Sequence, residues 1–295
     1  MVYLAVVSLL WAFSFGLIGS ALAGVDSFFV ATLRLLCATL LFLPYLRSRK
    51  IRRKDCGKLM TYGAIQFGLM YSCYMQAFHY LPSHLVALFS ILTPLYVVLI
   101  HDLRRRQFTP RWVLAACLSV AGAVAIKAKE VPAGDFWIGF GLMQVAGLSF
   151  AYGQVAYRDW KRKNPGVADQ EVFSLLAAGG ALTALQFSLY FTEWGELPAN
   201  ESQWGAILYL GVVASGFGFF LWNKGAARTS PGTLAAFNNA VVPLAMACSL
   251  FVFGEIDDIA KESLLRLGIG SSLILIALIL SRKTSSSTSF TRRGH

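Results

Sequence analysis

The sequence predicts an all-α integral membrane protein in which ten transmembrane helices form two inverted five-helix repeats. Three observations predict this fold: long uncharged apolar runs, basic residues gathered in alternate loops, and a proline motif that occurs twice. Of the 295 residues, 56% are hydrophobic and 14% are charged, whereas about 25% of the residues of a soluble domain are charged. The composition therefore excludes an ordinary soluble protein.

The apolar residues form ten runs, each close to the roughly 20 residues that cross a bilayer core. The expected spans are 2–19, 28–46, 58–78, 83–101, 111–127, 136–157, 170–191, 204–223, 233–252 and 262–281. The first run has no basic segment before it and no small-residue cleavage site after it, so we expect a retained helix and not a signal peptide. Residues 284–295 are expected to form a disordered cytoplasmic tail.

The net charge of +11 indicates an orientation in the membrane and not a nucleic-acid partner. Of the 26 Lys and Arg residues, 21 lie in alternate loops or in the tail. Short loops rich in Lys and Arg stay in the cytoplasm, which predicts both termini inside (N-in/C-in). Because five spans is an odd number, a second five-span repeat (131–283) must enter the membrane in the opposite sense to the first (1–130).

Parts of the fourth and ninth spans match each other when the chain is shifted by 149 residues. The matching pairs are Pro82 and Pro231, Leu85 and Leu234, Ala87 and Ala236, Pro94 and Pro243, and Leu95 and Leu244. A proline inside a helix removes a backbone donor and frees the carbonyl four residues back. For Pro94 and Pro243 these carbonyls belong to Ser90 and Asn239. Paired helix breaks predict a central site or gate, although kinks can also serve packing alone.

Arg34 is the only charged group that we place well inside an expected span. A charge in the bilayer is costly and commonly marks a functional site, so we expect Arg34 to neutralise an anionic group of a substrate, such as a carboxylate. Two alternatives stay open: the side chain extends to the outer interface, or it caps the carbonyls that the prolines free.

Other polar and aromatic side chains of the spans are candidates for an apolar pocket with a few oriented polar groups. The candidate substrate-binding residues besides Arg34 are Trp11, Ser14, Gln66, Tyr71, Tyr74, Ser90, Gln144, Tyr152, Trp222, Asn223, Asn238 and Asn239, and the candidate gating kinks are Pro94 and Pro243. Interfacial aromatic residues and hydrogen bonds between helices are the competing interpretations of this set.

The chain resembles the EamA-type transporters of the drug/metabolite transporter superfamily. The resemblance is carried by SGFGFFLWNKGAARTSPGTLAAFNNAVVPLAMACSLFVFGE (215–255), by LLWAFSFGLI in the first span, by the Arg34-bearing second span and by VAGAVAIK in the fifth. It implies two inverted five-helix repeats in which the first four spans of each repeat line a cavity. The fifth span of each repeat is then expected to pack outside. Asn238 and Asn239 depart from the aliphatic stretch common in the family, and the tail after residue 283 has no family pattern.

Patterns that indicate an enzyme are missing from the sequence. There is no GxxxxGK[ST] phosphate loop, the four histidines have no metal-ligand spacing, and the five cysteines form no CxxC pair. We therefore expect neither a catalytic residue nor a metal or other cofactor.

The function expected from the sequence is secondary transport by alternating access around a midplane cavity. The resemblance favours an exporter or exchanger of small organic metabolites such as amino acids, in a bacterial inner membrane. A passive channel and a membrane-embedded enzyme acting on lipid-linked substrates are the alternatives. The expected partners are the solute and the lipid bilayer, with no nucleic acid, and the protein is expected to be a monomer or weak homodimer.

Overall fold

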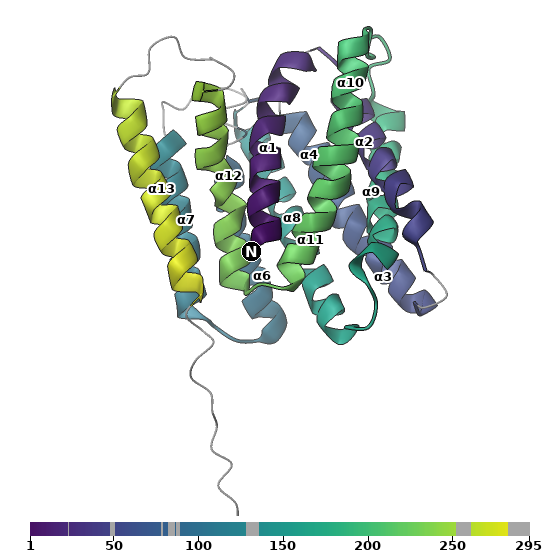
Figure 1. Ribbon diagram of the computed structural model, residues 1–295. Coiled ribbons are helices and arrows are strands. Elements are labelled where there is room, and N and C mark those ends of the chain that lie inside the picture. Colours follow the sequence, from purple (N-terminus) through teal and green to yellow (C-terminus); the bar gives the residue numbers. More distant parts are fainter. Residues whose placement is uncertain are drawn as a thin grey trace, which may run out of the picture.

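The computed structural model describes residues 1–22, 24–47, 51–77, 79–81, 86, 89–127, 136–251 and 261–282. The regular secondary structure of these residues is helical, and the long helices stand side by side in one bundle (Figure 1). The helices are α1 (Val2–Ala21), α2 (Ser27–Phe42), α3 (Arg53–Gly63), α4 (Met70–Ala77), α6 (Thr93–Arg105), α7 (Pro110–Lys127), α8 (Phe136–Lys163), α9 (Phe173–Phe191), α10 (Glu201–Tyr209), α11 (Gly218–Ala227), α12 (Pro231–Phe251) and α13 (Lys261–Arg282). Short 3-10 turns lie at Leu43–Tyr45, Ser90–Leu92 (η4) and Asp169–Glu171.

The apolar helices agree with the predicted all-α membrane protein. Among the described residues, four helical stretches are long and apolar enough to cross a bilayer: Ser27–Tyr45, Phe136–Lys163, Phe173–Phe191 and Glu201–Ala227. The count of ten spans and the inverted orientation stay predictions. Pro82, Leu85, Ala87 and the tail 284–295 lie outside the described residues.

Two of the long helices contain a π-helical segment. The first segment, η3 (Ala64–Leu69), joins α3 to α4, and the second, η6 (Leu210–Phe217), joins α10 to α11. They lie at matching places, because Gln66 of η3 and Ser215 of η6 are separated by the same 149 residues as Pro94 and Pro243. A π segment is rare and frequently lies at a functional site.

The two prolines of the repeated motif lie in different surroundings, and the gating role expected for both stays a prediction. Pro243 lies inside α12. Pro94, in contrast, lies in the first turn of α6, and η4 precedes it. Proline is well accommodated there because the amides of a first turn have no helical acceptor. The carbonyl of Ser90 accepts a hydrogen bond of 2.7 Å from the hydroxyl of Thr93, so the helix start itself satisfies this group.

The helices of the two halves interlock. Helix α2 of the first half packs on η6 of the second, and α9 of the second half packs on α3 and η3 of the first. Glycines permit the second contact: a Cβ at Gly63 would collide with the backbone of Leu176, and one at Gly179 with the backbone of Met60. Small residues allow such close approach between membrane helices.

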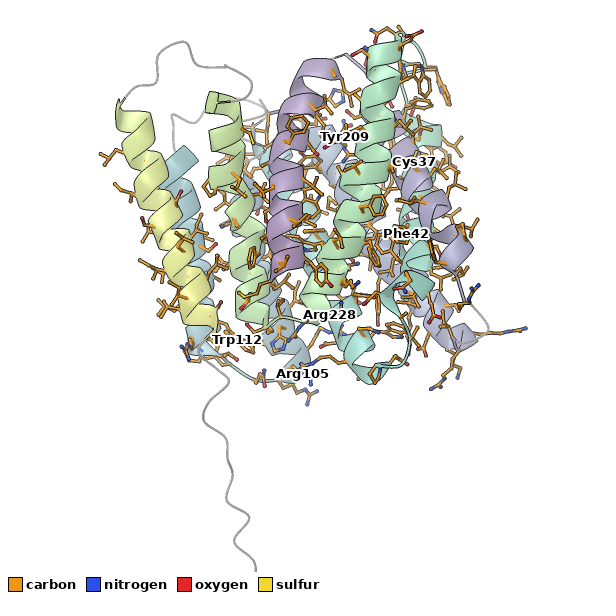
Figure 2. All side chains as sticks on the ribbon, in the orientation of Figure 1. Cys37, Phe42, Arg105, Trp112, Tyr209 and Arg228 are labelled. Atoms are coloured by element: carbon orange, nitrogen blue, oxygen red, sulfur yellow. The ribbon has the colours of Figure 1, made fainter. Side chains whose placement is uncertain are left out.

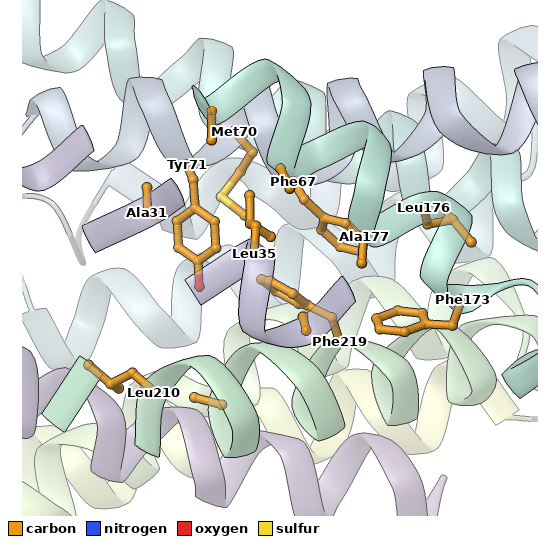
Figure 3. Packing of buried hydrophobic residues seen from close by; sticks show 14 of the residues in the cluster. Ala31, Leu35, Phe67, Met70, Tyr71, Phe173, Leu176, Ala177, Leu210 and Phe219 are labelled. Atoms are coloured by element: carbon orange, nitrogen blue, oxygen red, sulfur yellow. The ribbon is translucent and has the colours of Figure 1, made fainter. Parts of the chain in front are cut away.

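Aromatic and aliphatic side chains from both halves fill the space between these contacts (Figure 3). Phe67 of η3 and Phe219 of α11 stack with their ring centroids 4.4 Å apart. Helices α7 and α13 pack together at one side of the bundle (Figure 1). The core that positions the candidate site residues is therefore shared by the two halves.

Candidate functional site

Arg34 lies in a small polar cluster inside the bundle, formed with Tyr71 of α4 and Ser215 of η6. Its Nε donates a hydrogen bond of 3.1 Å to the Ser215 hydroxyl. The guanidinium carbon lies 4.8 Å from the centroid of the Tyr71 ring, which is within the range of a cation–π contact. The hydroxyls of Tyr71 and Ser215 are 3.2 Å apart and hydrogen-bonded.

This guanidinium is buried without a full set of partners. Only 3% of Arg34 is exposed, and its buried Nη1 has no hydrogen-bond partner. None of the ion pairs among the described residues includes it. A buried charge is expected to be paired, so this cluster is suited to receive an anion.

A second polar contact crosses between the halves at Gln66 and Asn223. The Gln66 Nε2 donates to Asn223 Oδ1 over 2.8 Å, and Asn223 Nδ2 donates back to Gln66 Oε1 over 3.3 Å. Gln66 is 0% and Asn223 1% exposed. The two amides therefore form a closed, uncharged pair away from solvent.

Next to this pair lies a second amide contact, between Gln154 of α8 and Asn238 of α12. The Gln154 carbonyl oxygen accepts from the Trp222 indole over 3.1 Å and from Asn238 Nδ2 over 3.4 Å, while Gln154 Nε2 donates to Asn238 Oδ1 over 3.3 Å. Since Trp222 precedes Asn223 in α11, that helix links both amide contacts. Of the two adjacent asparagines, Asn238 is therefore the one that contacts Gln154.

Aromatic rings surround Trp11 between the Arg34 cluster and the amides. The Trp11 ring centroid lies 4.8 Å from that of Trp222, 5.5 Å from Phe219 and 5.9 Å from Phe150. The Trp11 indole donates to the Ala214 carbonyl over 3.0 Å. The structure thus has one charged cluster, at Arg34, and two uncharged amide contacts, with the aromatic rings around Trp11 beside them. Ser215 of the charged cluster and Asn223 of the amide pair lie eight residues apart on the continuous helix of η6 and α11, which corresponds to about 12 Å along the helix axis.

Comparison with known proteins decides the family. The EamA-like transporter family matches residues 1–127 and 134–283. This chain belongs to that family. The family membership confirms the resemblance seen in the sequence, the expectation of a transporter in place of an enzyme, and a multi-pass location in the cell membrane.

Two relatives of this EamA-family protein carry names that state a substrate. A protein of Pseudomonas aeruginosa named "Probable biotin transporter" is 41% identical over 283 residues, which cover 95% of this chain and 96% of the relative. A protein of Escherichia coli K12 named "Biotin transporter" is 37% identical over 257 residues, covering 86% and 85%. A solved crystal structure, 20% identical, has a TM-score of 0.74 over 95% of this chain and 96% of that chain, and supports the fold alone.

Several predicted site residues of the EamA-family protein lie apart from the two polar contacts. Gln144 accepts a hydrogen bond of 2.7 Å from the Tyr96 hydroxyl, and its own Nε2 is buried without a partner. Asn239 donates to the Ile91 carbonyl over 3.0 Å, which joins α12 to η4. Ser14 donates to the carbonyl of the preceding turn of its own helix. The contacts of Gln144 and Asn239 are hydrogen bonds between helices, as in the competing interpretation, whereas the contact of Ser14 stays within its own helix.

Two predicted aromatic residues lie on different sides of this arrangement. The Tyr74 ring centroid is 6.3 Å from that of Tyr71, so Tyr74 adjoins the Arg34 cluster. The guanidinium carbon of Arg104, near the end of α6, lies 5.8 Å from the ring centroid of Tyr152. Tyr152 is therefore not brought to the polar contacts described above.

Ser215 and Gln154 are the two polar residues of these contacts that the sequence reasoning missed. Ser215 is the counterpart of Gln66 under the same shift of 149 residues that pairs the prolines, so extending the overlay to the third and eighth spans would have found it. Gln154 lies within the expected sixth span, where its amide was itself a signal. No group of three or more His, Cys, Asp or Glu side chains among the described residues is arranged to hold a metal ion.

Ion pairs join helices at one end of the bundle, which we call the basic end and define by Arg104, Arg105 and Arg228. Arg104 and Arg105 each contact Asp159 at 3.2 Å, and so tie α6 to α8. Arg228 contacts Asp169 at 3.1 Å. Figure 2 shows Arg105 and Arg228 at the same end. At the other end, a pocket of about 310 Å³ is lined by Asp26, Phe28, Gln76, His79, Tyr80, Phe191 and Glu193.

Proposed function

We propose that this EamA-family protein is a secondary transporter of biotin that works by alternating access of two inverted repeats. The proposal replaces the amino acids expected at first, because two relatives that match most of the chain are named for biotin. Biotin carries a carboxylate on an apolar tail and an apolar fused ring that ends in a cyclic urea. It therefore needs one positive group, an apolar surface and neutral hydrogen-bonding groups.

The observation that carries the proposal is the unpaired Nη1 of buried Arg34. A guanidinium with a free N–H is suited to a carboxylate, because a charge-assisted hydrogen bond is about twice as strong as a neutral one. The hydroxyl of Ser215 and the ring of Tyr71 hold the guanidinium in place without neutralising it. We assign the carboxylate of biotin to this cluster.

The rest of the site favours an acid without an ammonium group. An amino acid would require an acceptor or a carboxylate for its ammonium, and none of the residues that contact Arg34 in the described structure is acidic. The rings near Trp11 supply the apolar surface that a fused ring needs. These features support an apolar carboxylic acid in preference to a zwitterion.

Radiolabelled biotin and purified protein in liposomes test the proposal. Saturable uptake that is stimulated by biotin inside the vesicle is the expected behaviour of an alternating-access transporter, and reversing the gradient reports the direction. The variant Arg34→Ala should lower biotin affinity by about 30-fold or more, as removal of one partner of a buried charge pair costs at least about 2 kcal/mol. The biotin affinity of Arg34→Lys should be intermediate, because lysine keeps the positive charge but lacks the paired N–H donors with which a guanidinium binds a carboxylate.

Arg53→Ala is the matched control, since it removes an exposed arginine from the start of α3 and should leave biotin transport unchanged. Uptake that neither saturates nor responds to internal biotin would favour the channel alternative. Wild-type affinity in a well-folded Arg34→Ala protein would overturn the assignment of the carboxylate.

A further inference from the structure

The pair of Gln66 and Asn223 has a hydrogen-bonding pattern that a cyclic urea can enter. Each amide is both donor and acceptor, over 2.8 and 3.3 Å, and both side chains are fully buried. A cyclic urea presents one carbonyl acceptor flanked by two N–H donors. Opening the pair around such a ring would exchange the amide–amide bonds for amide–urea bonds without leaving a buried polar group unpaired.

We infer that Gln66 and Asn223 recognise the ureido group of the substrate and set the selectivity for it, an inference that rests on the proposed function. An apolar ring inserted between these amides would leave buried donors and acceptors unpaired. A site built for hydrogen bonding rejects an analogue that lacks the bonding group for this reason. The pair therefore distinguishes a ureido acid from another acid with the same tail.

The spacing of the polar contacts fits recognition of the two ends of one molecule. Ser215, which contacts Arg34, and Asn223 belong to one continuous helix, about 12 Å apart by the rise of an α-helix. The carboxylate end is charged and the amide end is neutral, as are the two ends of biotin. Each end of the site includes one residue from a π segment: Ser215 of η6 at the charged end and Gln66 of η3 at the neutral end.

The packing around Gln66 fixes the direction of its amide. The Gln66 side chain lies directly on Gly153 of α8, where a Cβ would collide with it. The neighbouring residue of α8, Gln154, holds Trp222, which adjoins Asn223. Gly153 therefore provides the room that lets Gln66 reach Asn223, and an alanine there would displace Gln66 without changing either amide.

The test measures the competition of three acids against radiolabelled biotin on the purified full chain. Unlabelled biotin and desthiobiotin carry the urea, whereas lipoic acid has the same acid tail on a ring without urea. We expect the wild type to prefer the two ureido acids over lipoic acid by about 10- to 100-fold, the equivalent of one or two unpaired buried groups. In Gln66→Met/Asn223→Leu, this preference should fall to near parity.

The double variant replaces both partners by apolar side chains of similar shape, which leaves no unpaired group in the folded protein. Gly153→Ala is a second variant in case the double variant does not fold, and it should also lower the preference for the urea. The control Gln170→Met changes an exposed glutamine and should keep the wild-type preference. Biotinamide, which lacks the acid, should stay a poor competitor in every variant with Arg34 intact.

The outcomes separate the inference from the proposed function. A folded double variant that still prefers ureido acids, or one that loses affinity equally for all three acids, would show that the pair only joins helices. That result would overturn the ureido assignment and leave biotin as the substrate. A wild-type protein that does not bind biotin at all would overturn the proposed function and, with it, this assignment.

Discussion

Two helix contacts in this protein have the same construction and different chemistry. In one, α2 packs on η6, and in the other α9 packs on η3. A glycine of each π segment permits the approach: Gly211 lies against Cys37 and Arg34, and Gly68 lies against Thr183. The first contact presents a buried, incompletely paired guanidinium, whereas the Thr183 hydroxyl donates to the Gly179 carbonyl of its own helix over 3.1 Å.

Under the proposed function, the α2 contact serves the substrate and the α9 contact serves the fold. Both contacts need glycine, since both bring helices close together. Among the described residues of the two contacts, the α2 contact is the one with a buried charge whose hydrogen bonds are incomplete, and such a cost is characteristic of function. Changes in the α9 contact should therefore affect stability, and changes in the α2 contact should affect the substrate.

The largest effect should come from Gly179→Ala in the α9 contact. Its new Cβ would collide with the backbone of Met60, which cannot move aside as a flexible side chain can. We expect a loss of about 3 kcal/mol or more in unfolding free energy, at the upper end for overpacking, measured by unfolding of the purified protein. Gly57→Ala is the control: its Cβ meets nothing within 4 Å, and helix propensity should stabilise it by about 0.5–1 kcal/mol. Equal stability of the two variants would contradict a tight α9 contact.

A smaller effect on stability, with an effect on the substrate, is expected for Gly211→Ala. The new Cβ would lie 2.8 Å from the Cβ of Cys37, which is closer than real Cβ atoms approach, and 3.4 Å from the Cα of Arg34, so α2 must shift. We expect a cost of about 1 kcal/mol in stability, together with weaker biotin binding, because Arg34 moves relative to Ser215.

Binding and unfolding measured on the same preparation separate these two effects. Gly205→Ala in α10 is the matched control, because its Cβ meets nothing within 4 Å. If Gly211→Ala loses stability and keeps wild-type biotin affinity, the α2 contact is as purely structural as the α9 contact.

The smallest effect should come from Thr183→Val. This change keeps the shape of the side chain and removes a hydroxyl that bonds only within α9. Hydrogen bonds between membrane helices contribute about 0.6 kcal/mol on average. Loss of this bond within α9 should change the unfolding free energy by no more than that, and biotin transport should not change. A transport loss as large as that of the Arg34 variants would mean that both contacts serve the substrate.

The sequence predicted the features that depend on composition and on residues near in the chain. Apolar runs and basic loops indicated membrane helices, and the motif around Trp222 and Pro231 indicated the family that the comparisons confirm. The interior position of Arg34 followed from one charged residue in an apolar run, and the structure buries it. Its environment did not follow, because Ser215 is 181 residues away in the chain.

Features that depend on tertiary packing were predicted poorly. Pro94 lies in the first turn of α6, directly after the 3-10 turn η4, where proline is accommodated without losing a hydrogen bond, and the sequence did not reveal this position. The π segments have no sequence signal of their own, because they differ from an α-helix only in which backbone groups pair. The adjacent amides Asn238 and Asn239 were both candidates for the substrate site, but only the structure shows that the first meets Gln154 and the second the Ile91 carbonyl.

The separation of Arg34 from Ser215 along the chain also bears on how the protein is made. Synthesis begins at the N-terminus, so α2 enters the bilayer long before the ribosome has produced η6. During that interval Tyr71 becomes available from the same half, but the hydroxyl that accepts from the Arg34 guanidinium does not yet exist. The nascent first half thus carries an arginine whose hydrogen-bond acceptor arrives only with η6, so the polar cluster around Arg34 is completed late in biogenesis.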